Sequence, residues 1–217
     1  VEEERNNPVK YMFEKIRNTI LFWRYNTHPA KMEHRSRKVV LFGSHLAHNC
    51  FRDEEFRRLI KFEKHNEEEQ NRLFNELTVT NIVLLMLILD QRVQETSEEF
   101  HREYLQALRA EIPKFYSAFL RRINIPEHLA SMWDKLVEMR YDEYSRDMLE
   151  MRRQFFEVEN DERAYQIASD NRALIFQTVV FGLYHHLMRG KIKKGDPFYL
   201  FLQTYLIGVH KGLIKRI

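Results

Sequence analysis

The chain has 217 residues, of which 31% are charged and 13% aromatic, with only 6 glycines and 5 prolines. This composition favours a helical globular protein of one domain and argues against a disordered or β-rich one. The single cysteine, Cys50, excludes an internal disulfide framework and a cysteine-built zinc cluster, and it fits a reducing compartment.

The net charge of +3 is distributed unevenly along the chain. Residues 171–217 contain eight Lys and Arg residues and one acidic residue, Asp196, which gives +7 and leaves −4 for residues 1–170. A basic and apolar C-terminal quarter suits an anionic membrane surface, a nucleic-acid backbone or an acidic partner.

Apolar residues recur at helical spacing along the first half of the chain, and no stretch shows the alternation of a strand. One helix is expected from Asn7–Pro8 and a second over residues 30–50. Asp53 is placed to cap a third helix. The stretch 78–93, "TVTNIVLLMLILDQRV", is apolar all round, as is typical of a central buried helix. Its longest apolar run is shorter than the roughly 20 residues that cross a bilayer, so no transmembrane segment is expected.

The second half of the chain continues in the same way. Thr96 with Glu99 forms the pattern of a capping box, and Pro113 is expected to kink or split the helix that follows. Asn124 is expected to cap a long amphipathic helix. Asp196 with Pro197 predicts the start of the last helix. The sequence therefore predicts an all-α fold, a single bundle of about eight or nine helices, with residues 1–50 as a helical extension and residues 51–217 as the bundle.

Few residues have the spacing of a catalytic or metal site. Glu98 and His101 form one Glu-x-x-His pair, which contributes to di-iron sites in helical bundles, but such a site needs a second pair that the sequence lacks. Neither the nucleophile-elbow pattern nor a phosphate-binding glycine loop occurs. We therefore expect a protein that is not an enzyme and has no cofactor or bound metal.

Two other groups of histidine and cysteine residues are candidates. His45, His48 and Cys50 are close on one helix, but they do not form a complete ligand set. His185 and His186 are adjacent, so they point about 100° apart on a helix. We expect them at a helix C-terminus, where the partial negative charge favours imidazolium.

Two surfaces are candidates for binding. The joint between the last two apolar segments is basic, and we predict that it contacts a membrane or a partner together with the basic end of the chain. The long helix after residue 126 has a methionine and aromatic stripe, which serves either as core or as an apolar partner face, because thioether side chains repack easily. The predicted basic residues are Arg189, Lys191, Lys193, Lys194, Lys215 and Arg216, and the predicted apolar face is Met132, Trp133, Met139 and Tyr144.

The order of features from Phe74 to Leu213 resembles a known family. An apolar helix introduced by Phe74–Asn75 is followed by a helix ending in "FLRRINIPEHL" and by the long helix "MWDKLVEMRYDEYSRDM". A polar gap then precedes "ALIFQTVVFGL" and "DPFYLFLQTYLIGVHKGL". This order and spacing resemble the ubiquinol–cytochrome c chaperone family, the helical assembly factors of respiratory complex III.

The resemblance implies a non-enzymatic helper or accessory subunit of a respiratory-chain complex, on the matrix side of the mitochondrial inner membrane. Its expected partners are inner-membrane subunits such as newly made cytochrome b. An anionic lipid surface is a further possible contact. Two alternatives remain open: a structural or RNA-contacting component of a mitochondrial assembly such as the mitoribosome, and a carboxylate–histidine metalloprotein using Glu98 and His101.

Overall fold

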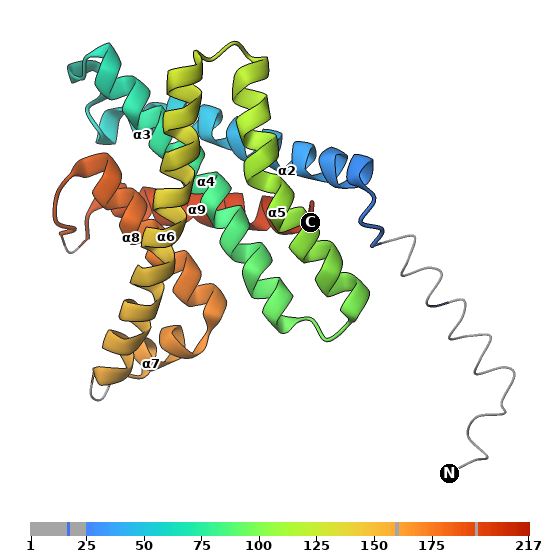
Figure 1. The fold of residues 1–217 in the computed structure, drawn as a ribbon. Helices are drawn as coiled ribbons and strands as arrows, with labels where there is room; N and C mark the ends of the chain where they lie inside the picture. The colour runs from blue at the N-terminus through green and yellow to red at the C-terminus, as the bar shows by residue number, and fades with distance from the viewer. Residues whose placement is uncertain (1–16, 18–24, 159–160, 194) are drawn as a thin grey trace, which may run out of the picture.

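The computed structural model describes residues 17, 25–158, 161–193 and 195–217, and the helix expected from Asn7 lies outside these residues. From residue 25 on, the described chain contains eight α-helices, one short 3-10 helix and no strand, which confirms the predicted all-α fold (Figure 1). The elements are α2 (Pro29–Arg52), α3 (Glu54–Leu59), η2 (Phe62–Lys64), α4 (Glu67–Glu95), α5 (Glu99–Arg122), α6 (Glu127–Glu157), α7 (Glu162–Ser169), α8 (Asn171–Met188) and α9 (Pro197–Ile214).

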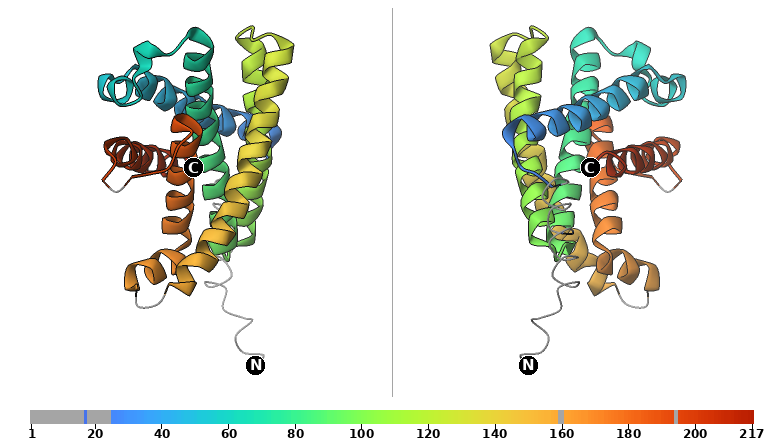
Figure 2. Two further views of the ribbon diagram at one scale, coloured as in Figure 1. Left: turned by 90° about the vertical axis from the view of Figure 1, so that its left-hand side faces the viewer. Right: turned by 90° about the vertical axis from the view of Figure 1, so that its right-hand side faces the viewer.

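Helix α4 is the central element of the bundle, as its apolar sequence predicts. It contacts α2, α5, α6, α8 and α9, and every residue from 77 to 89 is buried. Figure 2 shows α5, α6 and α8 running beside it, while α2 crosses α4 and α5. By length and composition alone α4 could cross a membrane, but 83% of its most apolar window is buried inside the bundle. A core helix surrounded by others meets the same criteria.

Buried polar side chains on α4 attach it to three neighbouring helices. The Thr80 hydroxyl lies 3.2 Å from the Tyr144 hydroxyl of α6. The Asn81 amide donates to the Gly43 carbonyl of α2 at 2.9 Å and to the Tyr205 hydroxyl of α9 at 2.6 Å. Since an unpaired polar group is costly in the core, these bonds fix the register of α4 against its neighbours.

The predicted helix caps are partly confirmed. The Asp53 side chain accepts from the backbone N–H of Phe56, and Asp196 accepts from that of Phe198 at the start of α9. The prediction of a capping box at Thr96 is wrong, because Thr96 is the C-cap residue of α4 and its N–H donates to a carbonyl of that helix. Helix α5 begins three residues later, without a side-chain cap.

Two predictions about the α5–α6 hairpin also need correction. Pro113 lies inside α5 and does not split it, because Ile112 and Phe115 on either side are buried in the core. Asn124 does not cap α6; it adopts a left-handed conformation with φ of 61° between the two helices. Asparagine tolerates this conformation better than most residues, and Pro126 is the N-cap residue of α6.

The boundary expected at residue 50 falls inside α2. Val39, Val40 and Ala47 of this helix are fully buried, and α2 contacts both α4 and α5. The described residues from 29 to 50 therefore belong to the bundle and do not form an extension of it.

Candidate functional site

The candidate site is an apolar groove between the first half of α6 and the start of α4. Figure 2 shows the α5–α6 hairpin diverging from the first turns of α4, and a groove of about 930 Å³ lies there. Its apolar lining consists of Phe74, Ile125, Leu129, Met132, Trp133, Leu136 and Met139.

Large apolar side chains of α6 are exposed along this groove. Met132 is 60% exposed, Met139 is 59% exposed and Leu129 is 36% exposed, while Trp133 is partly buried against the core. Contiguous exposed apolar side chains are typical of surfaces that bind a partner. Methionine adapts its shape to different partners because its side chain is unbranched and flexible.

Tyr144 does not belong to this apolar partner face, which corrects the prediction. Its side chain is fully buried, and burial raises the pKa of its phenol. Trp133 and Tyr144 are eleven residues apart, so they point within about 20° of each other on a helix. Both residues therefore lie on one face of α6, but α8 covers the part of that face around Tyr144, where Gly182 lies against the ring.

A network of charged side chains lies under the groove. Glu76 of α4 accepts two hydrogen bonds from Arg140 of α6, at 2.7 and 3.0 Å, and these side chains are only 6% and 14% exposed. Arg140 also pairs with Glu143 at 2.8 Å, and Glu143 lies 3.1 Å from the His186 ring of α8. The contact with His186 is the first cause that lowers the pKa of Glu143, and Arg140 adds to it. This network holds α4, α6 and α8 together beneath the groove.

The entrance of the groove beside α4 is acidic. Glu67 and Glu68 in the first turn of α4 are exposed, Glu68 lines the groove, and neither forms an ion pair with any described residue. Glu69 is different: it pairs with Arg72 at 2.6 Å and with Arg189 at 3.2 Å. The hydrogen bond from Arg72 is the main reason that the pKa of Glu69 is lowered.

The structure separates the predicted basic residues. Arg189 ends α8 in a left-handed conformation and pairs with Glu69. Lys191 and Lys193 are exposed and form no ion pair with a described residue. Lys194 lies outside the described residues.

The other two predicted basic residues lie at the far end of α9. Lys215 and Arg216 follow its last residue, and its 18 residues span about 27 Å. The Arg216 guanidinium lies 3.5 Å from the centre of the Phe42 ring. The joint and the end of the chain are therefore two separate basic sites.

The two residues of the Glu-x-x-His pair contact different partners. Glu98 pairs with Arg17 at 3.0 Å, whereas the His101 ring lies 3.2 Å from the Thr96 hydroxyl and stacks on Tyr25. Among the described residues, no three His, Cys, Asp or Glu side chains are grouped as metal ligands.

The remaining histidine and cysteine candidates have ordinary structural environments. His45 bonds to Asn49 at 3.1 Å, and His48 is exposed. Cys50 is buried, and burial raises the pKa of its thiol, which disfavours the reactive thiolate. His185 and His186 lie in the last turn of α8, where they were expected.

The predicted partner face contained only some of the groove residues. Helical spacing places Leu129 and Leu136 near the same stripe of α6, although the predicted face did not include them. Phe74 and Ile125 come from α4 and from the α5–α6 turn, and no periodicity links them to α6. Comparison with known proteins adds no candidate, since no protein-family model, curated protein or solved structure matches the chain.

Proposed function

We propose that this protein is a non-enzymatic binding protein that holds an amphipathic helix of a partner in the groove between α4 and α6. The observation that supports this most directly is the row of exposed apolar side chains along a groove of about 930 Å³. Covering Met132 and Met139 would remove apolar area from water, which is the main favourable term in such association.

The shape of the groove favours a helix over an extended peptide. The stretch from Leu129 to Met139 rises about 15 Å along α6, which matches about three turns of a helix lying beside it. Its apolar side chains come from a helix surface, so they present ridges that accept side chains at helical spacing. An extended peptide would instead need an unpaired strand edge for its backbone, and the described chain contains no strand.

The charges at the entrance select among such helices. Glu67 and Glu68 are exposed without an ion-pair partner in the described chain, and Glu68 lines the groove. A partner helix with Lys or Arg beside its apolar face complements this end, whereas an acidic one is repelled. The proposed occupant is therefore a basic amphipathic helix.

The wider setting that we propose is a helper or accessory subunit of a respiratory-chain complex at the matrix face of the mitochondrial inner membrane. The resemblance over residues 74–213 supports it, as does the charge of +7 in residues 171–217. In this setting the partner helix belongs to an inner-membrane subunit such as newly made cytochrome b.

The groove is tested with two designed 18-residue peptides that share one leucine face and have either Lys or Glu on the polar face. The chain has two tryptophans, so a Trp23→Phe background leaves Trp133 in the groove as the only tryptophan. We expect the Lys peptide to shift Trp133 emission to shorter wavelength and to bind at least tenfold more tightly than the Glu peptide.

Variants locate the binding on the molecule. Met132→Glu should weaken the Lys peptide at least tenfold, while the control Leu149→Glu, at a side chain that is 62% exposed on α6 outside the groove, should leave it unchanged. Equal loss in both variants, or no binding by either peptide, refutes the groove as the site.

The mitochondrial setting needs a separate test. Affinity purification from mitochondria should recover inner-membrane respiratory subunits with the wild-type chain and lose them with Met132→Glu. Recovery of cytosolic proteins alone contradicts this setting while leaving the peptide result intact.

A further inference from the structure

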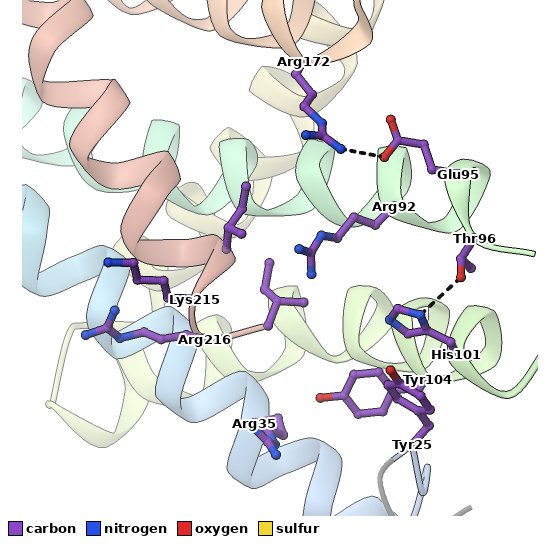
Figure 3. Close-up of a pocket in the computed structure, with 12 residues that line it drawn as sticks. Tyr25, Arg35, Arg92, Glu95, Thr96, His101, Tyr104, Arg172, Lys215 and Arg216 are labelled. Carbon is purple, nitrogen blue, oxygen red and sulfur yellow. Dashed lines mark hydrogen bonds and ion pairs between the residues drawn. The ribbon is translucent and has the colours of Figure 1, made fainter. Parts of the chain in front are cut away.

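A second cavity lies at the opposite end of α4 from the groove. It measures about 640 Å³ and lies where α2, the end of α4, the start of α5, the start of α8 and the end of α9 meet (Figure 3). Arginines from three different helices line it: Arg35 of α2, Arg92 of α4 and Arg172 of α8. Glu95 is the only carboxylate side chain among its lining residues.

The cationic side chains that line this cavity outnumber its carboxylate side chains. Glu95 pairs with Arg172 at 3.4 Å. Arg35 and Arg92 are half-buried, and neither forms an ion pair within the part of the chain that the structure describes. Figure 3 shows the Arg92 side chain reaching from α4 into the middle of the cavity. The charges of Arg92 and Arg172, after burial, also lower the pKa of nearby His210, so the positive potential extends beyond the lining.

The rest of the lining adds hydrogen-bonding groups and shape. Thr96, His101 and Tyr104 form the wall that α4 and α5 contribute. Burial is the main cause that raises the pKa of Tyr104, so its phenol stays protonated and keeps its O–H donor at neutral pH. Lys215 and Arg216 also line the cavity, but their charged ends extend away from it in Figure 3.

From this arrangement we infer that the cavity binds a small molecule carrying a phosphate or pyrophosphate group. The half-buried guanidinium groups of Arg35 and Arg92 have no carboxylate partner in the described chain, so their N–H donors are available to bind an anion. Phosphate oxygens match the planar fork of arginine and form charge-assisted hydrogen bonds with it. The volume lies within the range of small-molecule sites, and Arg35, Arg92 and Arg172 surround one ligand from three helices.

The test is isothermal titration of the full chain with pyrophosphate and with inorganic phosphate. We expect one saturable site that prefers pyrophosphate, since it contacts more than one arginine. Arg35→Gln and Arg92→Gln should each weaken binding at least tenfold. The matched control is Arg122→Gln, an exposed arginine at the other end of α5 that forms no ion pair with a described residue, and it should bind as the wild type does.

Folding of the variants is followed by thermal melts without ligand. Removing one of several like charges relieves repulsion, so Arg35→Gln and Arg92→Gln should melt no lower than the wild type. A loss of binding in these variants then reports on the site and not on unfolding.

A second arm separates the sources of the phosphate. Vesicles containing phosphatidic acid are compared with free pyrophosphate, and binding of the vesicles alone, lost in Arg92→Gln, identifies a lipid head group as the ligand. The inference is overturned by two results: no saturable binding of any of these probes at low millimolar phosphate, or binding that Arg35→Gln and Arg92→Gln leave unchanged.

Discussion

Replacing Gly182 by alanine should destabilise the bundle through one contact between α8 and α6. A Cβ at this position would lie 2.2 Å from Cε1 and 2.9 Å from Cδ1 of the Tyr144 ring. The ring is fully buried, and its hydroxyl lies 3.2 Å from the Thr80 hydroxyl. The ring therefore has no free space to enter without breaking that bond.

The magnitude follows from the separation that is needed. The closest pair must move from 2.2 Å to at least 3.4 Å, so α8 and α6 must part or the ring must leave its rotamer. Overpacking of this kind typically costs about 1–3 kcal/mol. Each kcal/mol lowers the melting temperature of a domain of this size by about 2–4 °C, so we expect a fall of about 2–12 °C.

The assay is urea unfolding together with thermal melts, and Gly208→Ala is the control. Gly208 lies in α9, and the space that a Cβ would occupy there is open, so alanine should stabilise the helix by up to about 1 kcal/mol. Tyr144→Ala alone should cost about 3–5 kcal/mol by leaving a cavity. In the double variant the new methyl enters that cavity, so the two effects should couple by about 1–3 kcal/mol. Additive effects, or a Gly182→Ala protein as stable as wild type, would refute the contact.

Two further predictions concern the junction of α4, α8 and α9. Because the folded-state pKa of Glu69 is lowered, its ionised form stabilises the fold above its ordinary value of 4.5, and this contribution is lost as pH falls through the folded pKa. The melting-temperature difference between wild type and Glu69→Gln should therefore be largest at neutral pH and shrink below about pH 4.5; a constant difference in melts across this range contradicts the ion pairs. Replacing Lys191, Lys193 and Lys194 together with Gln should weaken binding to cardiolipin-containing vesicles by up to about 3 kcal/mol, measured by flotation. The melting temperature should stay unchanged in this triple variant, whereas Arg189→Gln should lower it. Equal flotation of the triple variant and the wild type removes the membrane contact.

The fold could be predicted from the sequence where one local signal was decisive. The stretch around Val83 is apolar on every side, so burial was expected. Asp53 and Asp196 each stand directly before a helix, and aspartate is a common N-cap residue. Pro113 does not split α5, because the burial of Ile112 and Phe115 beside it outweighs its local cost. Local patterns do not contain that tertiary term.

The candidate site was harder to predict because it depends on which helix covers which part of α6. Helical spacing places the stripe from Trp133 to Tyr144 on one face of α6. In the structure, however, α8 covers Tyr144 and leaves Met132 and Met139 exposed. The cavity around Arg92 was missed for the same reason, since Arg35, Arg92 and Arg172 are far apart in the chain and only the fold brings them together.

The basic joint between α8 and α9 is explained in part by helix geometry. The C-terminus of α8 presents carbonyl oxygens that need donors, and Arg72 of α4 donates to those of His186 and Leu187. Glu69 then holds both Arg72 and Arg189, so one carboxylate neutralises the cations nearest the helix end. Lys191 and Lys193 contribute to none of these bonds, although they are as basic and as close in sequence. The basic residues of the joint therefore have two different roles. Arg189 pairs with Glu69 and links the end of α8 to α4, whereas Lys191 and Lys193 are exposed to solvent, so only these lysines are available to an anionic surface.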